Sequence, residues 1–449
     1  FLEEVENRMG VMPVKPLLLQ MAWPMMLSMF VEALYNLVDS IFIARYSQDA
    51  FVALGLAFPV QMMMIAICVG TGIGVNAMVA RRLGEKRVED ASAVAMNGFF
   101  LYLLSWMVFF IFGLTVGPHF VGFFTSNASV AEYGRQYLTI VTMGSIGICM
   151  QFAAERVMQA TGNSKGPMIV QGVGAVINLI LDPILIFGIE GIIPSFGVTG
   201  AAVATILGQM VGMVIGLVMM RHNKIIRFRF RSFRPNGKVI GEIYRIGVPA
   251  MVMQSLMTVM TLGMNKILAK NEAQIFILSA YFKLQNFIFM PAFGLNNGMV
   301  PILGYNYGAK NGRRISDTIH FGLILSVAIM AVGTALFLLA PGLILRCFDA
   351  PADVVALGIP ALRMISVSFL FAAVAIIFTA SFQALGKPMM SLIISLLRQL
   401  VIVLPATYLL LQIDPNLVWL SIPAAEMISC IVATVFYRKL HANVIVPLL

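Results

Sequence analysis

Long apolar segments separated by short polar loops recur along the whole chain. A helix that crosses a bilayer needs about 20 predominantly apolar residues, and twelve segments of this kind can be marked. They cover approximately residues 17–44, 53–79, 92–116, 134–160, 167–188, 197–220, 244–268, 278–304, 319–344, 355–385, 388–411 and 416–437. The pattern predicts an all-α membrane protein with twelve transmembrane helices.

Basic residues gather in the loops that follow every second apolar segment. Those loops carry Arg81, Arg82, Lys86, Arg87, Lys165, the run 221–238, Lys310, Arg313, Arg314 and Lys387. The opposite loops hold little more than Arg45, Lys270 and Arg346. Because cytoplasmic loops carry an excess of Lys and Arg, we expect both termini in the cytoplasm and the protein in a bacterial plasma (inner) membrane. The chain starts at Phe1 with no visible signal peptide, so we expect a trimmed N-terminus.

The two halves of the chain are related in sequence. Prolines, glycines and one lysine of the first half recur in the second at offsets of 221 to 225 residues: Pro24 with Pro249, Gly74 with Gly298, Gly84 with Gly308, Lys86 with Lys310, Pro167 with Pro388 and Pro183 with Pro405. Six helices per half is an even number, so the repeats share one orientation. We therefore predict two pseudo-symmetric six-helix bundles: an N-lobe over 1–220, a linker over 221–238 and a C-lobe over 239–449.

Composition supports a membrane protein and argues against nucleic-acid binding. The chain is 60% hydrophobic and only 11% charged, whereas soluble proteins are about 25% charged. The formal net charge of +10 comes from loops, and the longest basic run, 221–238, is short and tethered between helices. Its interleaved Arg and Phe favour contact with anionic lipid headgroups. The four cysteines, Cys68, Cys149, Cys347 and Cys430, show neither metal-ligand spacing nor a disulfide framework.

Acidic and polar residues inside the apolar segments are the candidate chemistry. Glu32 and Asp39 lie about two turns apart in the first segment, and Asn178 and Asp182 lie one turn apart in the fifth, just before Pro183. Thr205 lies at similar depth in the sixth. Asp39, Asn178, Asp182 and Thr205 can therefore converge into a site for a hard cation such as Na⁺ or for a proton shared by two carboxylates. The same residues could instead be a hydrogen-bond network that only packs helices, and Asp39 could simply reach interfacial water.

The second half does not copy this set. Met264 matches Asp39, Leu404 matches Asp182 and Glu426 matches Thr205. Arg398 and Glu426 could form a structural salt bridge within the second half.

Glu155 and Arg156 are adjacent, so they face different directions and are expected to have different partners. The residues that we expect to line a substrate cavity are Tyr137, Glu32, Glu155, Met264, Arg398 and Glu426.

Enzymatic motifs are missing from the sequence. No G-x-x-x-x-G-K-[ST] motif and no H-E-x-x-H motif occurs. We therefore expect neither ATP-driven transport nor an enzyme, and no cofactor beyond a coupling Na⁺ or H⁺.

The sequence resembles the multidrug and toxic compound extrusion (MATE) family over essentially its whole length. The resemblance rests on YNLVDSIFIARY in the first segment, on the glycine-rich passage at 72–87, and on NLILDPILIFG in the fifth segment. The bacterial DinF-like branch of the family matches best, because of ERVMQATGNSKGPM and LLRQL. It implies a cation-coupled antiporter with V-shaped N- and C-lobes that exports amphipathic organic compounds. It assigns ion binding to Asp39, Asn178, Asp182 and Thr205 and a cavity position to Tyr137. Glu155 departs from the pattern, since relatives often have Asn there.

We therefore expect a secondary active exporter, driven by Na⁺ or H⁺ entry through alternating access and acting as a monomer. Its substrates are expected to be flat, amphipathic cations bound between the lobes. The main alternative is a flippase for lipids or lipid-linked sugars, which should line its cavity with more cationic residues. A receptor or a channel is a second alternative, and substrate flux against a gradient would exclude it.

Overall fold

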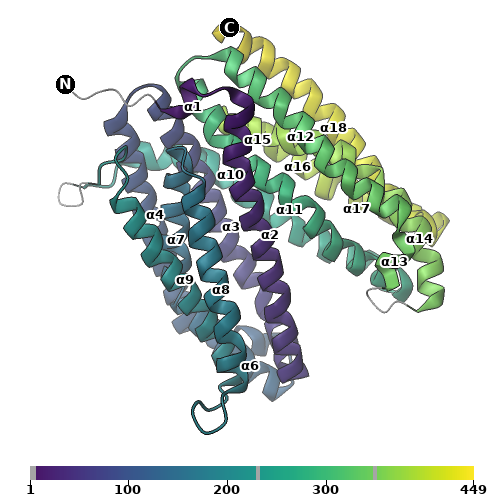
Figure 1. The fold of residues 1–449 in the computed structure, drawn as a ribbon. Helices are drawn as coiled ribbons and strands as arrows, with labels where there is room; N and C mark the ends of the chain where they lie inside the picture. The colour runs from purple at the N-terminus through teal and green to yellow at the C-terminus, as the bar shows by residue number, and fades with distance from the viewer. Residues whose placement is uncertain (1–6, 229–232, 347–350) are drawn as a thin grey trace. The chain divides into compact units, whose positions relative to one another are not determined.

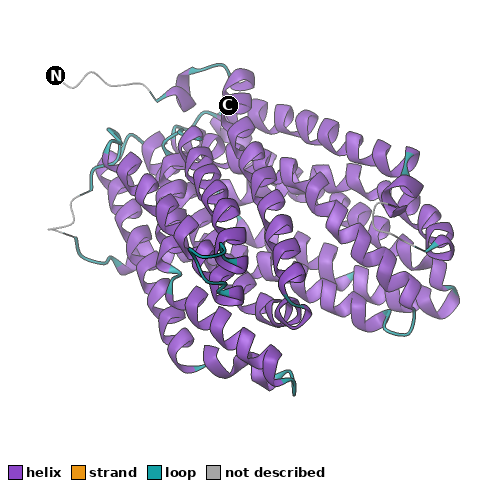
Figure 2. Ribbon diagram, turned by 60° about the horizontal axis from the view of Figure 1, so that its bottom comes forward, coloured by secondary structure: helices purple, strands orange, loops and turns teal. Residues whose placement is uncertain are grey.

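The structure is a computed structural model that describes residues 7–228, 233–346 and 351–449. Within these ranges the chain is helical, without a β-strand (Figure 2). The middle of the predicted linker, residues 229–232, and Cys347 lie outside the described residues. The all-α fold class predicted from the sequence is confirmed.

The helices of the first half follow the predicted apolar segments closely (Figure 1). They are α1 (Arg8–Val11), α2 (Val14–Tyr46), α3 (Gln48–Gly84), α4 (Val88–Thr115), α5 (Gly117–Phe120), η1 (Val121–Phe123), α6 (Ala128–Met143), α7 (Ile146–Ala160), α8 (Lys165–Phe187) and α9 (Gly197–Arg221).

The second half repeats this succession of helices. Its elements are α10 (Gly237–Ile267), α11 (Glu272–Gly308), α12 (Gly312–Leu339), α13 (Pro341–Arg346), α14 (Ala352–Ser366), α15 (Ser368–Ala384), α16 (Pro388–Leu396), the π-helix η3 (Leu397–Val401), α17 (Val403–Ile413), η4 (Pro415–Leu420), α18 (Ser421–Leu440), η5 (His441–Ile445) and η6 (Val446–Leu448).

Twelve membrane spans are formed when two broken helices are counted as one span each. Ten helices of the described chain are long and apolar enough to cross a bilayer, and two pairs, α6 with α7 and α14 with α15, bend by 43° and 40° at short breaks. These broken pairs are the fourth and tenth predicted segments. A hydropathy pattern finds such a span but cannot reveal the break, because the break does not interrupt the apolar run.

Backbone geometry confirms the internal repeat. Helices α3 and α11 both have 37 residues, and α4 and α12 both have 28. Lys86 and Lys310 are matched positions, and they are the two non-glycine residues of the described chain with positive φ, at 59° and 55°. Few residues other than Gly and Asn adopt this conformation readily. The two halves therefore use the same turn between their second and third spans.

The chain divides into two compact units whose boundaries fall inside helices rather than in a loop. The N-terminal unit is Leu27–Met251, and the C-terminal unit combines the described residues up to Met26 with Val252–Leu449. The first part of α2 therefore belongs with the later helices, and the first part of α10 with the earlier ones. The predicted division into lobes at 221–238 remains a prediction.

Matched glycines allow these exchanged segments to pack closely. In the N-terminal unit, a Cβ on Gly74 of α3 would lie 2.4 Å from the carbonyl oxygen of Ile243 in α10. In the C-terminal unit, a Cβ on Gly298 of α11 would lie 2.7 Å from Cα of Ala22 in α2. Small residues let helix backbones approach in a membrane, where the hydrophobic effect does not hold helices together. Each unit thus depends on a glycine at the same repeat position.

Each unit also has its own apolar core. Ala53, Val60 and Leu138 are among the fully or nearly fully buried residues of the N-terminal unit. In the C-terminal unit the rings of Phe337 and Phe369 meet edge to face, with centroids 5.1 Å apart. Such aromatic pairs contribute about 0.5–1.5 kcal/mol beyond the area that they bury.

A cluster of charged residues lies at the end of α3, outside the apolar span. Glu85 accepts hydrogen bonds from Arg82 Nη1 at 2.9 Å and from Arg81 Nε at 3.1 Å, and Arg82 Nη2 also donates to Glu242 Oε2 of α10 at 2.9 Å. Burial by itself would raise the pKa of Glu85, but the hydrogen bonds and positive charges of the two arginines outweigh burial and lower that pKa below its ordinary value of 4.5.

The glycine contact gives a first prediction. Gly74→Ala should lower the free energy of unfolding of the purified protein by about 2 kcal/mol, since overpacking a close contact costs about 1–3 kcal/mol. Gly55→Ala is the matched control in the same helix, because a Cβ there meets nothing within 4 Å. Thermal unfolding in detergent measures both variants, and equal stability of the two would show that the approach of α3 to α10 is not tight.

The Glu85 cluster gives a second prediction, for pH dependence. A carboxyl group with a lowered pKa stabilises the fold at neutral pH, and this stabilisation is lost as the pH falls below its ordinary value of 4.5. Glu85→Gln should therefore be less stable than wild type at pH 7, by about 1 kcal/mol or less, and the difference should shrink steadily as the pH falls below 4.5. A difference that grows on acidification would contradict the assigned role.

Candidate functional site

Three helices of the N-terminal unit carry the predicted ion-coupling residues. Asp39 lies in α2, Asn178 and Asp182 in α8, and Thr205 in α9. Helices α8 and α9 pack closely at a pair of glycines, because a Cβ on Gly208 would lie 2.7 Å from the carbonyl oxygen of Gly174. This close approach, one turn before Asn178, brings the polar residues of the two helices together.

The carboxyl groups of Asp39 and Asp182 lie within hydrogen-bonding reach of one another. Asp182 is completely buried. The Oδ1 oxygen of Asp39 is also buried and has no hydrogen-bond partner among the described residues. Two carboxylates this close repel one another unless a proton or a cation lies between them. The convergence predicted from the sequence is therefore present for the two acids.

Asn178 joins this pair through its side-chain amide. The hydrogen bonds orient its nitrogen toward Asp182 Oδ2, at 3.1 Å, and its oxygen toward the backbone N–H of Thr205, also at 3.1 Å. The hydroxyl of Thr205 donates to the carbonyl oxygen of Ala201, at 3.0 Å. In this arrangement the amide nitrogen of Asn178 stabilises the carboxylate of Asp182, and the amide oxygen accepts a hydrogen bond from Thr205.

A hollow in the N-terminal unit adjoins these residues and is partly open to the outside. Its lining includes the predicted residues Glu32, Asn178 and Thr205, together with Tyr35. Glutamines also line it: Gln151, Gln171 and Gln209. The hollow is polar on the side of these residues and apolar at Ile148 and Phe152.

Glu155 lies behind this lining, fully buried. Its Oε1 accepts a hydrogen bond from Gln151 Nε2 at 2.9 Å, and its Oε2 accepts one from Gln171 Nε2 at 2.8 Å. Neighbouring Arg156 donates instead to Gln159, at 3.0 Å. The prediction that Glu155 and Arg156 have different partners is confirmed. Sequence analysis missed both glutamines, although the spacing of Gln151 and Glu155 places them on one helix face.

Tyr137 is buried in the same unit, outside the lining of the hollow. Its hydroxyl accepts a hydrogen bond from Gln61 Nε2 of α3, at 2.7 Å. Nothing in the sequence indicates this partner, because residues 61 and 137 lie in different helices.

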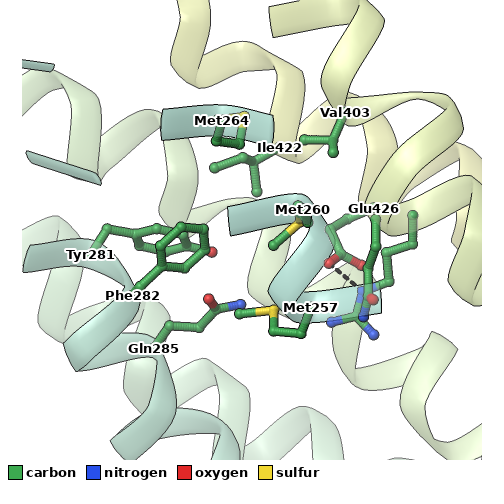
Figure 3. Close-up of a pocket in the computed structure, with 11 residues that line it drawn as sticks. Met257, Met260, Met264, Tyr281, Phe282, Gln285, Val403, Ile422 and Glu426 are labelled. Carbon is green, nitrogen blue, oxygen red and sulfur yellow. Dashed lines mark hydrogen bonds and ion pairs between the residues drawn. The ribbon is translucent and has the colours of Figure 1, made fainter. Parts of the chain in front are cut away.

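The remaining predicted residues lie in the C-terminal unit, where Met264, Arg398 and Glu426 line a second hollow (Figure 3). Arg398 Nε lies 2.5 Å from Glu426 Oε1, so the salt bridge predicted within the second half is confirmed. The N-terminal unit thus holds the ion-coupling candidates together with Glu32, Tyr137 and Glu155, and the C-terminal unit holds Met264, Arg398 and Glu426.

The MatE family model matches this chain twice, over residues 24–184 and 249–409. The same offset separates the two matches at both ends, which confirms the duplication inferred from the sequence.

Curated relatives are multidrug transporters by name. The chain is 26% identical to the multidrug export protein MepA of Staphylococcus haemolyticus over 369 residues, covering 81% of this chain and 80% of the relative. It is 23% identical to the probable multidrug resistance protein NorM of Thermotoga maritima, covering 88% and 85%.

Solved structures share the fold. An outward-facing multidrug resistance MATE family transporter of the MOP superfamily superposes with a TM-score of 0.91, at 24% identity and with 98% of each chain covered. Because the family model matches both halves and more than half of the residues, the protein belongs to the MatE family of multi-pass membrane transporters, the multidrug and toxic compound extrusion family.

Proposed function

We propose that the protein is a secondary exporter of amphipathic compounds, driven by cation entry and working by alternating access. The observation that carries the coupling proposal is the approach of the Asp39 and Asp182 carboxyl groups to within hydrogen-bonding reach inside an apolar unit. The names of the relatives, a multidrug export protein and a probable multidrug resistance protein, support export as the activity.

The proton is the coupling ion that the site favours over Na⁺. A pair of carboxyl groups at hydrogen-bonding reach can hold one proton between them. A Na⁺ site would need further oxygen ligands, yet the nitrogen of the Asn178 amide, and not its oxygen, faces Asp182. Na⁺ binding by Asp39, Asn178, Asp182 and Thr205 would require rotation of the amide.

Coupling follows from competition between the ion and the substrate. When the proton binds Asp39 and Asp182, it removes a negative charge beside the hollow that Glu32, Asn178 and Thr205 line. The affinity of the N-terminal unit for a cationic substrate then falls. By linkage, bound substrate lowers the affinity for the proton by the same factor. Proton entry can thus release the substrate on the far side of the membrane.

Orientation and assembly belong to the same proposal. The basic loops favour a cytoplasmic location for both termini, and the bacterial relatives support a plasma-membrane location. The segment 221–238 contacts anionic lipid, and the monomer is the transporting unit. The substrates are amphipathic and, because of the acids in the N-terminal unit, cationic.

The ion can be identified by imposing one gradient at a time on proteoliposomes. With ethidium as a fluorescent amphipathic cation, a proton gradient alone should drive transport against the substrate gradient, and a Na⁺ gradient alone should not. Transport that responds only to Na⁺ would overturn the proton assignment. Ethidium flux that never proceeds against its gradient would overturn antiport itself.

Neutralising either carboxyl group tests the site. Asp39→Asn and Asp182→Asn keep the side-chain volume and remove the charge, so each should abolish gradient-driven export while expression and folding are retained. Their stability should be equal to or higher than wild type, because a buried carboxylate without a full set of partners is costly. Asp353→Asn, an exposed acid in the first turn of α14, is the matched control and should export normally. Near-normal export by Asp39→Asn together with inactive Glu426→Gln would move coupling to the C-terminal unit.

A further inference from the structure

The two described ends of the linker are attached to α4 by hydrogen bonds. The backbone N–H of Arg227 donates to Ser92 Oγ at 3.1 Å, and the backbone N–H of Asn236 donates to Asn97 Oδ1 at 3.0 Å. Ser92 and Asn97 are buried residues of α4, about 7.5 Å apart along the helix axis at a rise of 1.5 Å per residue. We call these two ends the strap, which comprises residues 223–228 and 233–236.

Two aromatic contacts hold the same ends of the strap on α4. The rings of Phe228 and Phe99 meet edge to face with centroids 5.5 Å apart, and the rings of Phe233 and Phe100 are tilted with centroids 6.1 Å apart. Aromatic pairs of these geometries are attractive beyond the area that they bury. Because Phe99 and Phe100 are consecutive residues, both ends of the strap contact α4 at one level of the helix.

That level is where the lipid-facing surface of α4 begins. Further along α4, six exposed apolar residues lie on one helical face: Leu103, Leu104, Met107, Val108, Ile111 and Leu114. Phe100 lies on the same face, one turn earlier. An exposed apolar face on a membrane-spanning helix is a surface for lipid. The strap therefore lies at the boundary between the hydrocarbon and the headgroups.

The strap brings positive charges to this boundary, and no described acid neutralises them. Arg227 and Arg234 are direct chain neighbours of the two strap phenylalanines. Both arginines are exposed, and neither forms a salt bridge with any residue in the described ranges. The turn between α3 and α4 differs, because its Arg82 bonds Glu85 and Glu242. Three more exposed cations of the linker also lack an ion pair within those ranges: Arg221, Lys224 and Lys238.

An anionic phospholipid matches this combination better than a free anion does. The planar guanidinium of Arg suits a phosphate group, which it can bind with two hydrogen bonds. The cytoplasmic leaflet carries anionic lipids, which attract basic segments beside the membrane. The acyl chains of the same molecule can lie along the exposed face of α4, whereas a free phosphate has no part that contacts this apolar face.

We propose that Arg227 and Arg234 bind the phosphate of an anionic phospholipid of the cytoplasmic leaflet, whose acyl chains pack along α4. The contacts of Phe228 and Phe233 with α4 hold the two arginines at the level of the headgroups, so the site is preformed. This site gives residues and a geometry to the proposed contact of the linker with anionic lipid, and it rests on the proposed cytoplasmic orientation.

Lipid binding to the purified full chain in detergent tests the proposal. Native mass spectrometry measures the affinity for the first bound molecule of dioleoylphosphatidylglycerol and of dioleoylphosphatidylcholine, which share the same acyl chains. The anionic lipid should bind more tightly by about fivefold or more. Equal affinity for the two lipids would overturn the proposal. Displacement of phosphatidylglycerol by inorganic phosphate would also overturn it, since the site would then be one for a free anion.

Single variants locate the site on the strap. Arg227→Gln and Arg234→Gln should each lower the affinity for phosphatidylglycerol by about fivefold, the factor for one basic side chain beside an anionic surface, and leave phosphatidylcholine unchanged. Arg313→Gln is the matched control, because Arg313 is an exposed arginine without a described ion pair, in the first turn of α12. An equal loss in all three variants would show diffuse attraction by positive charge and would overturn the site.

A variant that keeps every charge tests whether the strap is preformed. Phe233→Leu retains an apolar side chain and removes the aromatic contact with Phe100. It should lower the affinity for phosphatidylglycerol by about threefold, because the arginines are then less firmly placed. Unchanged affinity in Phe233→Leu would overturn the role of the aromatic contacts.

The lipid assay separates this site from transport and from orientation. It uses no ion gradient, so loss of proton-driven export with intact lipid selectivity would overturn only the proposed coupling. An active exporter without lipid selectivity would overturn only the lipid site. Lys238→Cys, treated in intact cells with a maleimide that does not cross membranes, should react no more than wild type. Extra labelling would overturn the cytoplasmic orientation and the assignment to the cytoplasmic leaflet.

Discussion

The central constraint in this protein is the burial of two carboxyl groups, Asp39 and Asp182, close together within apolar helices. A charge in such a place is costly, and two like charges are costlier still. The structure accommodates them with an amide nitrogen of Asn178 directed at Asp182. The amide oxygen of Asn178 in turn accepts from the backbone N–H of Thr205, where α8 and α9 approach closely at Gly174 and Gly208. The repulsion between the two carboxyl groups is what a proton would relieve in the proposed coupling.

Glu155 shows the contrasting case within the same unit. Each of its oxygens receives a hydrogen bond from a glutamine, at 2.9 and 2.8 Å. A buried carboxylate with donors on both oxygens is stabilised in its charged form. Glu155 thus has a side-chain donor for each oxygen, whereas Oδ1 of Asp39 has no hydrogen-bond partner among the described residues.

Duplication gave the two units one shared turn and equal lengths of α3 with α11 and of α4 with α12, but not the same chemistry. Lys86 and Lys310 keep one unusual backbone conformation, and Gly74 and Gly298 keep one close helix contact. Met264 stands at the position that matches Asp39, and Arg398 of the π-helix η3 pairs with Glu426. One scaffold therefore carries a pair of acids in one unit and a pair of opposite charges in the other.

The sequence alone determined the helical class, the number of spans and the duplication. Hydropathy and repeated glycines can be read along the chain without knowing which helices are in contact. It also singled out Asp39, Asn178, Asp182 and the Arg398–Glu426 pair, since polar residues are rare in apolar segments and helical spacing shows which of them share a face. The glutamine partners of Glu155 and Tyr137 and the breaks at α6–α7 and α14–α15 were decided only by the tertiary structure. So was the exchange of the first parts of α2 and α10 between units. These features depend on distances between helices far apart in the chain or on small changes in helical winding, and neither leaves a periodic signal in the sequence.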